Sequence, residues 1–272
     1  MPYRLVVADL DGTLLGDEVV MSPAVLNAVA RIMELGGYFS VATGRTLSGA
    51  RPHARRLRIN APAILYQGAE IRDIETGAVI FQASIPLPIA QELIAFAVAE
   101  DVPLNVYVDD QVFTRERTAG SDFYATLNAI EVKAVGDLSR FLDRPPTKML
   151  LVSDPERLDP LAPRLKAQFA GRLQIVRSHR RFLEAIPFGV NKGRGLERLA
   201  GYLGIAQAET VALGDNDNDA EMVAWAGLGI AMGNGSAATK AAADVIAPPV
   251  EQDGAAWAIE RYVLPALGGC MP

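Results

Sequence analysis

Two aspartates stand close together near the start of the chain, in the segment Asp9-Leu10-Asp11-Gly12-Thr13. Carboxylates at this spacing, where a strand gives way to a loop, can converge on one ligand, and the glycine lets backbone N–H groups approach an anion. Asp-Gly is also common in simple turns. Apolar residues on both sides of the segment favour chemistry instead, because a surface turn rarely lies between two apolar runs.

A second acid-rich segment, Gly214-Asp215-Asn216-Asp217-Asn218-Asp219, follows a later apolar run. Its acids and amides make an oxygen-rich site that suits a hard cation. An EF-hand calcium loop is one alternative, but the positions that require glycine and glutamate in such a loop are Ala220 and Ala226 here. An acid-rich helix N-cap is another, but it does not explain so dense a cluster. We therefore predict a metal site at this segment.

Two weaker signals lie between these segments. In Thr43-Gly44-Arg45, a hydroxyl, a backbone N–H and a guanidinium can contact phosphate oxygens, although Gly-Arg is also frequent without such a role. In Asn191-Lys192-Gly193, a lysine stands at the start of a predicted helix, where the helix dipole favours acids. Binding of an anion would explain a lysine at this position, and a solvated surface position is the alternative.

The elements that must position these side chains alternate between strands and helices. The predicted strands are short and apolar, which is typical of a parallel sheet covered on both faces. Ligands bind at the carboxyl ends of such strands, and Asp9, Thr43 and Asp215 each stand where a predicted strand ends. The strands are expected at 4–10, 38–42, 63–66, 210–213, 228–232 and 244–247, and the helices at 23–35, 193–203 and 218–226, the first of them capped by Ser22.

The middle of the chain differs, because hairpins there lie among helices. Strands are expected at 78–85, 104–108, 111–114, 147–152 and within 173–186, and helices at 87–100 and 155–169. One hairpin turns at Asp109-Asp110. The pattern predicts an inserted α+β domain with an antiparallel sheet. We place this domain at 84–186, inserted into a Rossmann-like α/β core with a parallel sheet, formed by residues 1–83 and 187–272.

Composition excludes several classes of protein. The 272 residues carry a net charge of −6, which argues against nonspecific nucleic-acid binding. No apolar run is long enough to span a membrane, and the N-terminal segment has acids within its apolar run, unlike a signal peptide. The single cysteine, Cys270, cannot form an internal disulfide, which fits a reducing compartment. We therefore expect a cytoplasmic protein that binds neither nucleic acid nor membrane.

Taken in their order along the chain, the four signals resemble the motifs of the haloacid dehalogenase-like superfamily. The resemblance covers essentially the whole chain. The insertion resembles the type 2B cap of the Cof-like subfamily, and Met232-Gly233-Asn234-Gly235 resembles the tail of that subfamily. One departure is Gln67-Gly68-Ala69, where the family usually has Asn-Gly-Ala. The matching motifs are Asp9 to Thr13 for the first, Thr43-Gly44-Arg45 for the second, Lys192 for the third, and Gly214-Asp215 with Asn218-Asp219 for the fourth.

The resemblance implies a Mg²⁺-dependent phosphatase that works through an aspartyl-phosphate. It makes Asp9 the nucleophile, and Asp11 the group that protonates the leaving oxygen and then activates water. Mg²⁺ would be held by Asp9, the Asp11 carbonyl and Asp215. Asp219 and Asn234 would support this set, with Asp219 orienting Lys192 or a metal-bound water. The groups that would hold the phosphoryl oxygens are the side chains of Thr43, Arg45, Lys192 and Asn218 and the backbone N–H groups of Leu10 and Gly44.

The reaction and its substrate stay partly open on the sequence. The favoured function is hydrolysis of a small phosphorylated metabolite, with sugar phosphates as the favoured class. A phosphotransferase or phosphomutase on the same core would pass the phosphoryl group to a sugar hydroxyl rather than to water. A non-enzymatic phosphate-binding protein is the third hypothesis, but binding alone does not need Asp11. We expect a monomer or a homodimer.

Overall fold

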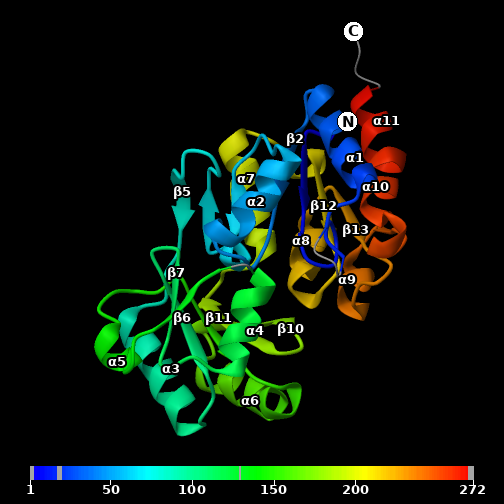
Figure 1. Cartoon of the computed structure of the whole chain (residues 1–272). Helices are drawn as coiled ribbons and strands as arrows, with labels where there is room; N and C mark the ends of the chain where they lie inside the picture. The colour runs from blue at the N-terminus through cyan, green and yellow to red at the C-terminus, as the bar shows by residue number, and fades with distance from the viewer. Residues whose placement is uncertain (1–2, 17–19, 129, 269–272) are drawn as a thin grey trace. The chain divides into compact units, whose positions relative to one another are not determined.

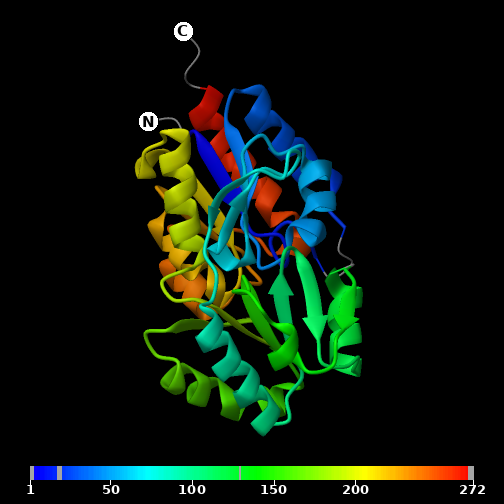
Figure 2. The ribbon, with the colours of Figure 1, turned by 90° about the vertical axis from the view of Figure 1, so that its left-hand side faces the viewer.

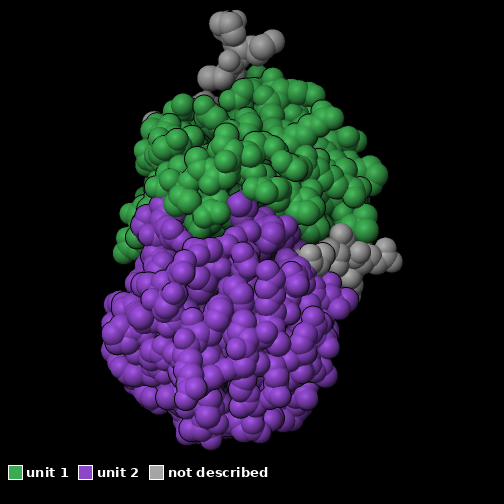
Figure 3. All heavy atoms as spheres, turned by 60° about the vertical axis from the view of Figure 1, so that its left-hand side comes forward, with its two compact units in different colours: residues 1–44, 50–80, 191–272 green, residues 45–49, 81–190 purple. Residues whose placement is uncertain are grey.

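The computed structural model describes residues 3–16, 20–128 and 130–268, so Cys270 lies outside the described residues. The chain divides into two units, which Figure 3 colours separately. The first comprises residues 1–44, 50–80 and 191–272, and the second comprises residues 45–49 and 81–190. The insertion expected at 84–186 lies inside the second unit, which also takes in residues 45–49, 81–83 and 187–190, all expected in the core.

The first unit is built on a sheet of parallel strands, whose order is β14 (Val245–Ile246), β13 (Leu228–Ala231), β12 (Thr210–Gly214), β1 (Leu5–Ala8) and β2 (Tyr38–Val41). Every residue of β1 and β12 is buried. Strands at the centre of a parallel sheet are covered on both faces, which explains why they are apolar throughout. The parallel α/β core expected from the sequence is therefore confirmed.

Helices cover both faces of this sheet. Helix α1 (Pro23–Glu34) begins where the Ser22 hydroxyl accepts a hydrogen bond from the Val25 N–H (3.2 Å), with proline at the first helical position. It lies with α10 (Gly254–Ala258) and α11 (Leu264–Gly268) on one face, and α7 (Lys192–Leu203) lies with α8 (Ala220–Trp225) on the other (Figure 1). Further helical segments are α2 (Leu47–Leu57), η2 (Gln207–Glu209), η3 (Asp217–Asp219), α9 (Ala237–Ala242), η4 (Val250–Gln252) and η5 (Ile259–Val263).

The strand expected at 63–66 differs from the prediction. β3 (Ala63–Leu65) pairs with β4 (Glu70–Arg72) in a separate sheet completed by β5 (Val79–Gln82). A parallel bridge from Ala42 to Ile64 links it to the main sheet. The cause is the tight turn η1 (Tyr66–Gly68), which reverses the chain before a helical crossover can form, so that β3 and β4 run antiparallel.

The second unit contains a sheet in the order β10 (Leu173–His179), β11 (Phe182–Pro187), β9 (Lys148–Val152), β6 (Leu104–Val108), β7 (Gln111–Thr114) and β8 (Val132–Ala134). The two expected hairpins, β6–β7 and β10–β11, are present. The sheet is mixed rather than antiparallel throughout, because β7 and β8 run parallel. A helix, α4 (Ala119–Asn128), lies between those two strands in the chain.

The two faces of this second sheet differ in chemistry. One face packs against α3 (Leu87–Ala99), α5 (Leu138–Phe141) and α6 (Pro155–Gln168) through a hydrophobic core that includes Val106 (Figure 2). Side chains alternate along a strand, so Asn105 and Tyr107 lie on the other face. Lys148 and Glu184 form a buried ion pair there, with 3.0 Å between Nζ and Oε2. None of the helices that the structure describes combines the length and apolar character needed to cross a membrane.

Candidate functional site

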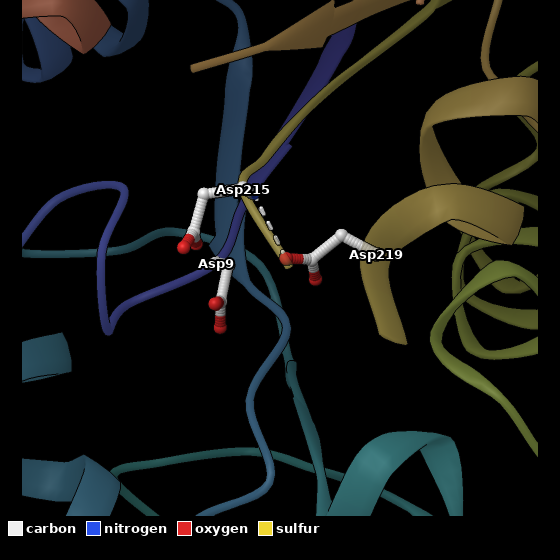
Figure 4. Close-up of side chains that lie close together, drawn as sticks. All are labelled: Asp9, Asp215 and Asp219. Carbon is white, nitrogen blue, oxygen red and sulfur yellow. Dashed lines mark hydrogen bonds between the residues drawn. The ribbon is translucent and has the colours of Figure 1, made fainter. Parts of the chain in front are cut away.

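Three carboxylates converge at the carboxyl ends of two neighbouring strands of the first unit. Asp9 follows β1 and Asp215 follows β12, and these strands pair with Ala8 opposite Leu213. Asp219 ends η3. One oxygen atom from each of Asp9, Asp215 and Asp219 lies within 4.8 Å of the others, and the three side chains lie close together (Figure 4). The structure thus brings the two acid-rich segments of the sequence to one place.

Asp219 is held by hydrogen bonds to both of its carboxylate oxygens. Its Oδ2 accepts from the backbone N–H groups of Asp215 (3.0 Å) and Asn216 (3.0 Å). Its Oδ1 accepts from Lys192 Nζ at 2.6 Å. Gly214 makes this packing possible, because a Cβ atom there would lie 2.4 Å from Asp219 Cβ. The turn after β12 therefore fixes Asp219 before any ligand binds.

The loop after β1 is fitted against Asp215. Gly12 has a φ of +86°, and a Cβ atom there would lie 2.3 Å from Asp215 Oδ2, so both conformation and space require glycine. The Thr13 hydroxyl donates to Asp215 Oδ1 at 3.0 Å. Asn234 holds the loop from outside, because its Nδ2 donates to the Gly12 carbonyl at 2.9 Å and its Oδ1 accepts from the Val250 N–H at 2.9 Å.

Lys192 is the cation of this cluster. It is the first residue of α7, after Asn191, whose side chain caps the helix by accepting from the Arg194 N–H. Its Nζ lies 2.8 Å from Asp9 Oδ1 and 2.6 Å from Asp219 Oδ1, and the side chain is only 1% exposed. A solvated surface lysine is therefore excluded.

Burial and crowding change the proton affinities of these groups. Burial, with the neighbouring carboxylates of Asp219, Asp215 and Asp11, raises the pKa of Asp9 well above its usual value, although Lys192 opposes the shift. Burial and the charge of Asp219 raise the pKa of Asp215 to about 7. Burial alone would lower the pKa of Lys192, but Asp219 and Asp9 raise it. Carboxylates that repel one another in this way attract a cation.

The other residues singled out from the sequence are placed as follows. Thr43 is buried, and its N–H donates to the Ile64 carbonyl at 2.9 Å. Asn218 Nδ2 donates to Gln67 Oε1 at 2.9 Å. Leu10 and Arg45 are buried, whereas Asp11 is exposed. Gly44 is the last residue of the first segment of the first unit, and Arg45 belongs to the second unit. The contacts of Thr13 and Gln67 were not predicted from the sequence. The available signal for Gln67 was that a glutamine stands where the family usually has asparagine.

Comparisons with known proteins show similarity over nearly the whole chain. A sequence model described as haloacid dehalogenase-like hydrolase matches residues 6–259. The chain is 30% identical over 272 residues to the 5-amino-6-(5-phospho-D-ribitylamino)uracil phosphatase YitU of Bacillus subtilis, covering 96% of this chain and 97% of that protein. A haloacid dehalogenase-like hydrolase from Bacteroides thetaiotaomicron has a TM-score of 0.87 at 31% identity, over 95% of this chain and 99% of that one. A solved subclass IIB sugar phosphatase shares the fold, with a TM-score of 0.83 at 20% identity over 96% and 99% of the two chains.

Proposed function

We propose, since the chain belongs to the haloacid dehalogenase-like hydrolases, that it is a Mg²⁺-dependent phosphatase for a small phosphorylated metabolite. The observation that carries the proposal is the set of Asp9, Asp219 and Lys192, all buried, beside the half-buried Asp215 at the carboxyl edge of the sheet. A nucleophilic carboxylate, cation-binding oxygens and a fixed positive charge are the groups that phosphoryl transfer needs in one place.

The donor set fits a hard divalent cation. The ion pair of Asp9 with Lys192 and the hydrogen bond from Thr13 to Asp215 each use Oδ1, whereas the hydrogen bonds to Asp219 use both of its oxygens. Asp9, Asp215 and the Asp11 carbonyl would therefore hold Mg²⁺, with Asp219 outside them as the group that orients Lys192. Bound there, Mg²⁺ would reduce the repulsion between the negatively charged nucleophile and the negatively charged phosphoryl group.

Asp9 is the proposed nucleophile. Its carboxylate oxygen forms a bond to phosphorus while the bond from phosphorus to the leaving oxygen breaks, which gives an aspartyl-phosphate. Water then attacks that phosphorus, inorganic phosphate leaves, and the Asp9 carboxylate is regenerated. Asp11 donates a proton to the leaving oxygen in the first step and accepts one from water in the second. Its exposed side chain supports this role, because an exposed carboxyl group can meet both the leaving group and solvent.

The phosphoryl oxygens need donors that stay fixed during both steps. Lys192 offers a charge held by two carboxylates, and Thr43 a hydroxyl on a buried residue. The Asn218 amide and the backbone N–H groups of Leu10 and Gly44 complete the proposed set. Preorganised donors of this kind stabilise charge in the transition state without reorganising.

The substrate class is proposed as sugar phosphates and related polyol phosphates. The support comes from two relatives, one named as a phosphatase of a phosphoribitylamino compound and one as a sugar phosphatase. We infer that the enzyme is cytoplasmic and that Arg45 contributes to substrate binding.

The test is release of inorganic phosphate from p-nitrophenyl phosphate and a panel of sugar phosphates, with Mg²⁺ and with EDTA. We expect turnover with Mg²⁺ and none with EDTA. Product analysis in the presence of sugar acceptors separates hydrolysis from transfer, because a phosphotransferase yields a new phosphate ester in place of inorganic phosphate. A folded protein that turns over no compound, with or without Mg²⁺, would contradict the proposal.

The variant Asp215→Asn tests the metal site through stability rather than activity. In EDTA we expect the variant to be more stable than wild type by about 1 kcal/mol, because one of the crowded carboxylates is removed. Millimolar Mg²⁺ should stabilise wild type by about 1–3 kcal/mol by mass action and leave the variant unchanged. Urea unfolding in both buffers measures this. Asp217→Asn, at an exposed position of the same segment, is the matched control and should respond to Mg²⁺ like wild type; equal responses in all three proteins would place the metal elsewhere.

A further inference from the structure

The short turn η1 holds its backbone in an unfavourable conformation. Tyr66 and Gln67 have φ angles of 51° and 61°, in the left-handed region that side chains other than glycine rarely adopt. Both residues are buried. Glycine would suit both positions if the turn served only to reverse the chain. Two large side chains in succession therefore indicate a further role. Such conformations persist where surrounding contacts hold them, and they gather at functional sites.

The contacts of Gln67 and Gly68 reach three separate segments of the site. The Gln67 N–H donates to the Thr43 carbonyl at 3.0 Å, and Gln67 Oε1 accepts from Asn218 Nδ2 at 2.9 Å. Gly68 packs directly on the residue before Lys192, since a Cβ atom at Gly68 would lie 2.2 Å from the Asn191 carbonyl oxygen. One turn therefore touches the segments that carry Thr43, Asn218 and Lys192.

The hydrogen bond between Gln67 and Asn218 orients the side-chain amide of Asn218. With one Nδ2–H bonded to Gln67, the plane of the Asn218 amide is fixed and its second Nδ2–H is left to donate elsewhere. The Asn218 Oδ1 atom is buried and has no partner among the described residues, so the protein itself does not hold the amide from that side. Loss of the Gln67 acceptor would leave Asn218 free to rotate.

We propose that Gln67 is a positioning residue, which holds the Asn218 amide in the orientation that binds a phosphoryl oxygen. This inference rests on the proposed phosphatase function and adds a residue to it. Gln67 acts through Asn218 and does not touch the reacting atoms. In its left-handed backbone conformation, this one residue donates from its N–H to Thr43 and accepts at its side chain from Asn218.

A double-mutant cycle on Gln67 and Asn218 separates positioning from a purely structural role. Gln67→Met keeps the length of the side chain and removes the acceptor, and Asn218→Ala removes the amide that it holds. We expect Gln67→Met to lower kcat/KM for p-nitrophenyl phosphate by about tenfold or more, and the double variant to match Asn218→Ala within about twofold. Gln168→Met, at an exposed position on α6, is the matched control and should keep wild-type activity.

Each outcome decides the proposal. The proposal is wrong if the losses of kcat/KM in the two single variants multiply in the double variant. It is also wrong if the loss of kcat/KM in Gln67→Met is explained by lowered stability in urea unfolding. If Gln67→Met does not fold, Gln67→Leu, which also lacks the acceptor, replaces it under the same criterion, and failure of both to fold would assign Gln67 a structural role only. If wild type itself releases no phosphate, the proposed function fails separately, and the same cycle on the Kd for inorganic phosphate by calorimetry then decides whether the two residues act as a unit.

Discussion

Replacement of Asp9 by asparagine should abolish turnover. The asparagine would keep the shape of the side chain, but an amide oxygen does not form the acyl-phosphate bond that the mechanism requires. We expect kcat for p-nitrophenyl phosphate to fall by about 10⁴-fold or more, down to the background of the assay. The fold should survive, because the change removes one charge from a crowded buried cluster. Steady-state kinetics with saturating Mg²⁺, beside urea unfolding of the same samples, measure both effects.

The control for Asp9→Asn is a carboxylate of the same chain that lies outside the cluster. Asp217 is exposed, although it stands between Asp215 and Asp219 in sequence, and Asp217→Asn should keep kcat within about threefold of wild type. Retained turnover in well-folded Asp9→Asn, measured on protein free of wild-type contamination, would mean that another group attacks phosphorus.

The sequence was sufficient for the parts of the fold that local patterns determine. Apolar strands that end in polar residues predicted the parallel core, and a serine before a proline predicted the start of α1. The family expected from the motifs is confirmed, since its sequence model matches residues 6–259. Because the carboxyl ends of parallel strands share one edge of a sheet, the strand pattern also implied that Asp9 and Asp215 would meet.

Contacts between distant segments could not be predicted in this way. The Thr13 hydroxyl and Asp215 are separated by 202 positions, and Gln67 and Asn218 by 151, so no local periodicity connects either pair. The burial of Lys192 is a similar case, since a lysine at a helix start usually faces solvent. What buries it is the meeting of Asp9 and Asp219, which only the folded sheet provides.

Weak local signals explain the elements that were missed. Helix α4, with the sequence AGSDFYATLN, has glycine and two polar residues in its first turn and no clear apolar stripe. Strand β8 has only three residues, and its parallel pairing with β7 depends on the α4 crossover, so the mixed sheet could not be foreseen. For β3, the apolar run Ala63–Leu65 was recognised, but its separate sheet depends on the left-handed turn that follows it.

Replacement of Lys192 by methionine should damage both activity and stability. Methionine fills nearly the same volume but leaves the carboxylates of Asp9 and Asp219, which lie 2.8 Å and 2.6 Å from Nζ, without their shared cation. Removal of one partner from a buried ion pair typically costs about 3–5 kcal/mol. We expect kcat/KM to fall by about 10³-fold, because a preorganised charge on the transferring group is lost. Urea unfolding in EDTA and phosphate-release kinetics with Mg²⁺ measure the two effects.

The same substitution at an exposed lysine isolates the effect of burial. Lys166 lies on the exposed side of α6, and Lys166→Met should change stability by no more than about 0.5 kcal/mol. Mg²⁺ adds a second criterion, since a cation bound beside Asp9 supplies part of the positive charge that Lys192→Met removes. The stability deficit of the variant should therefore shrink when Mg²⁺ replaces EDTA, while the loss of kcat/KM persists, because the phosphoryl oxygens still lack the Lys192 donor. A deficit that Mg²⁺ leaves unchanged would mean that the buried lysine and the metal act on different carboxylates.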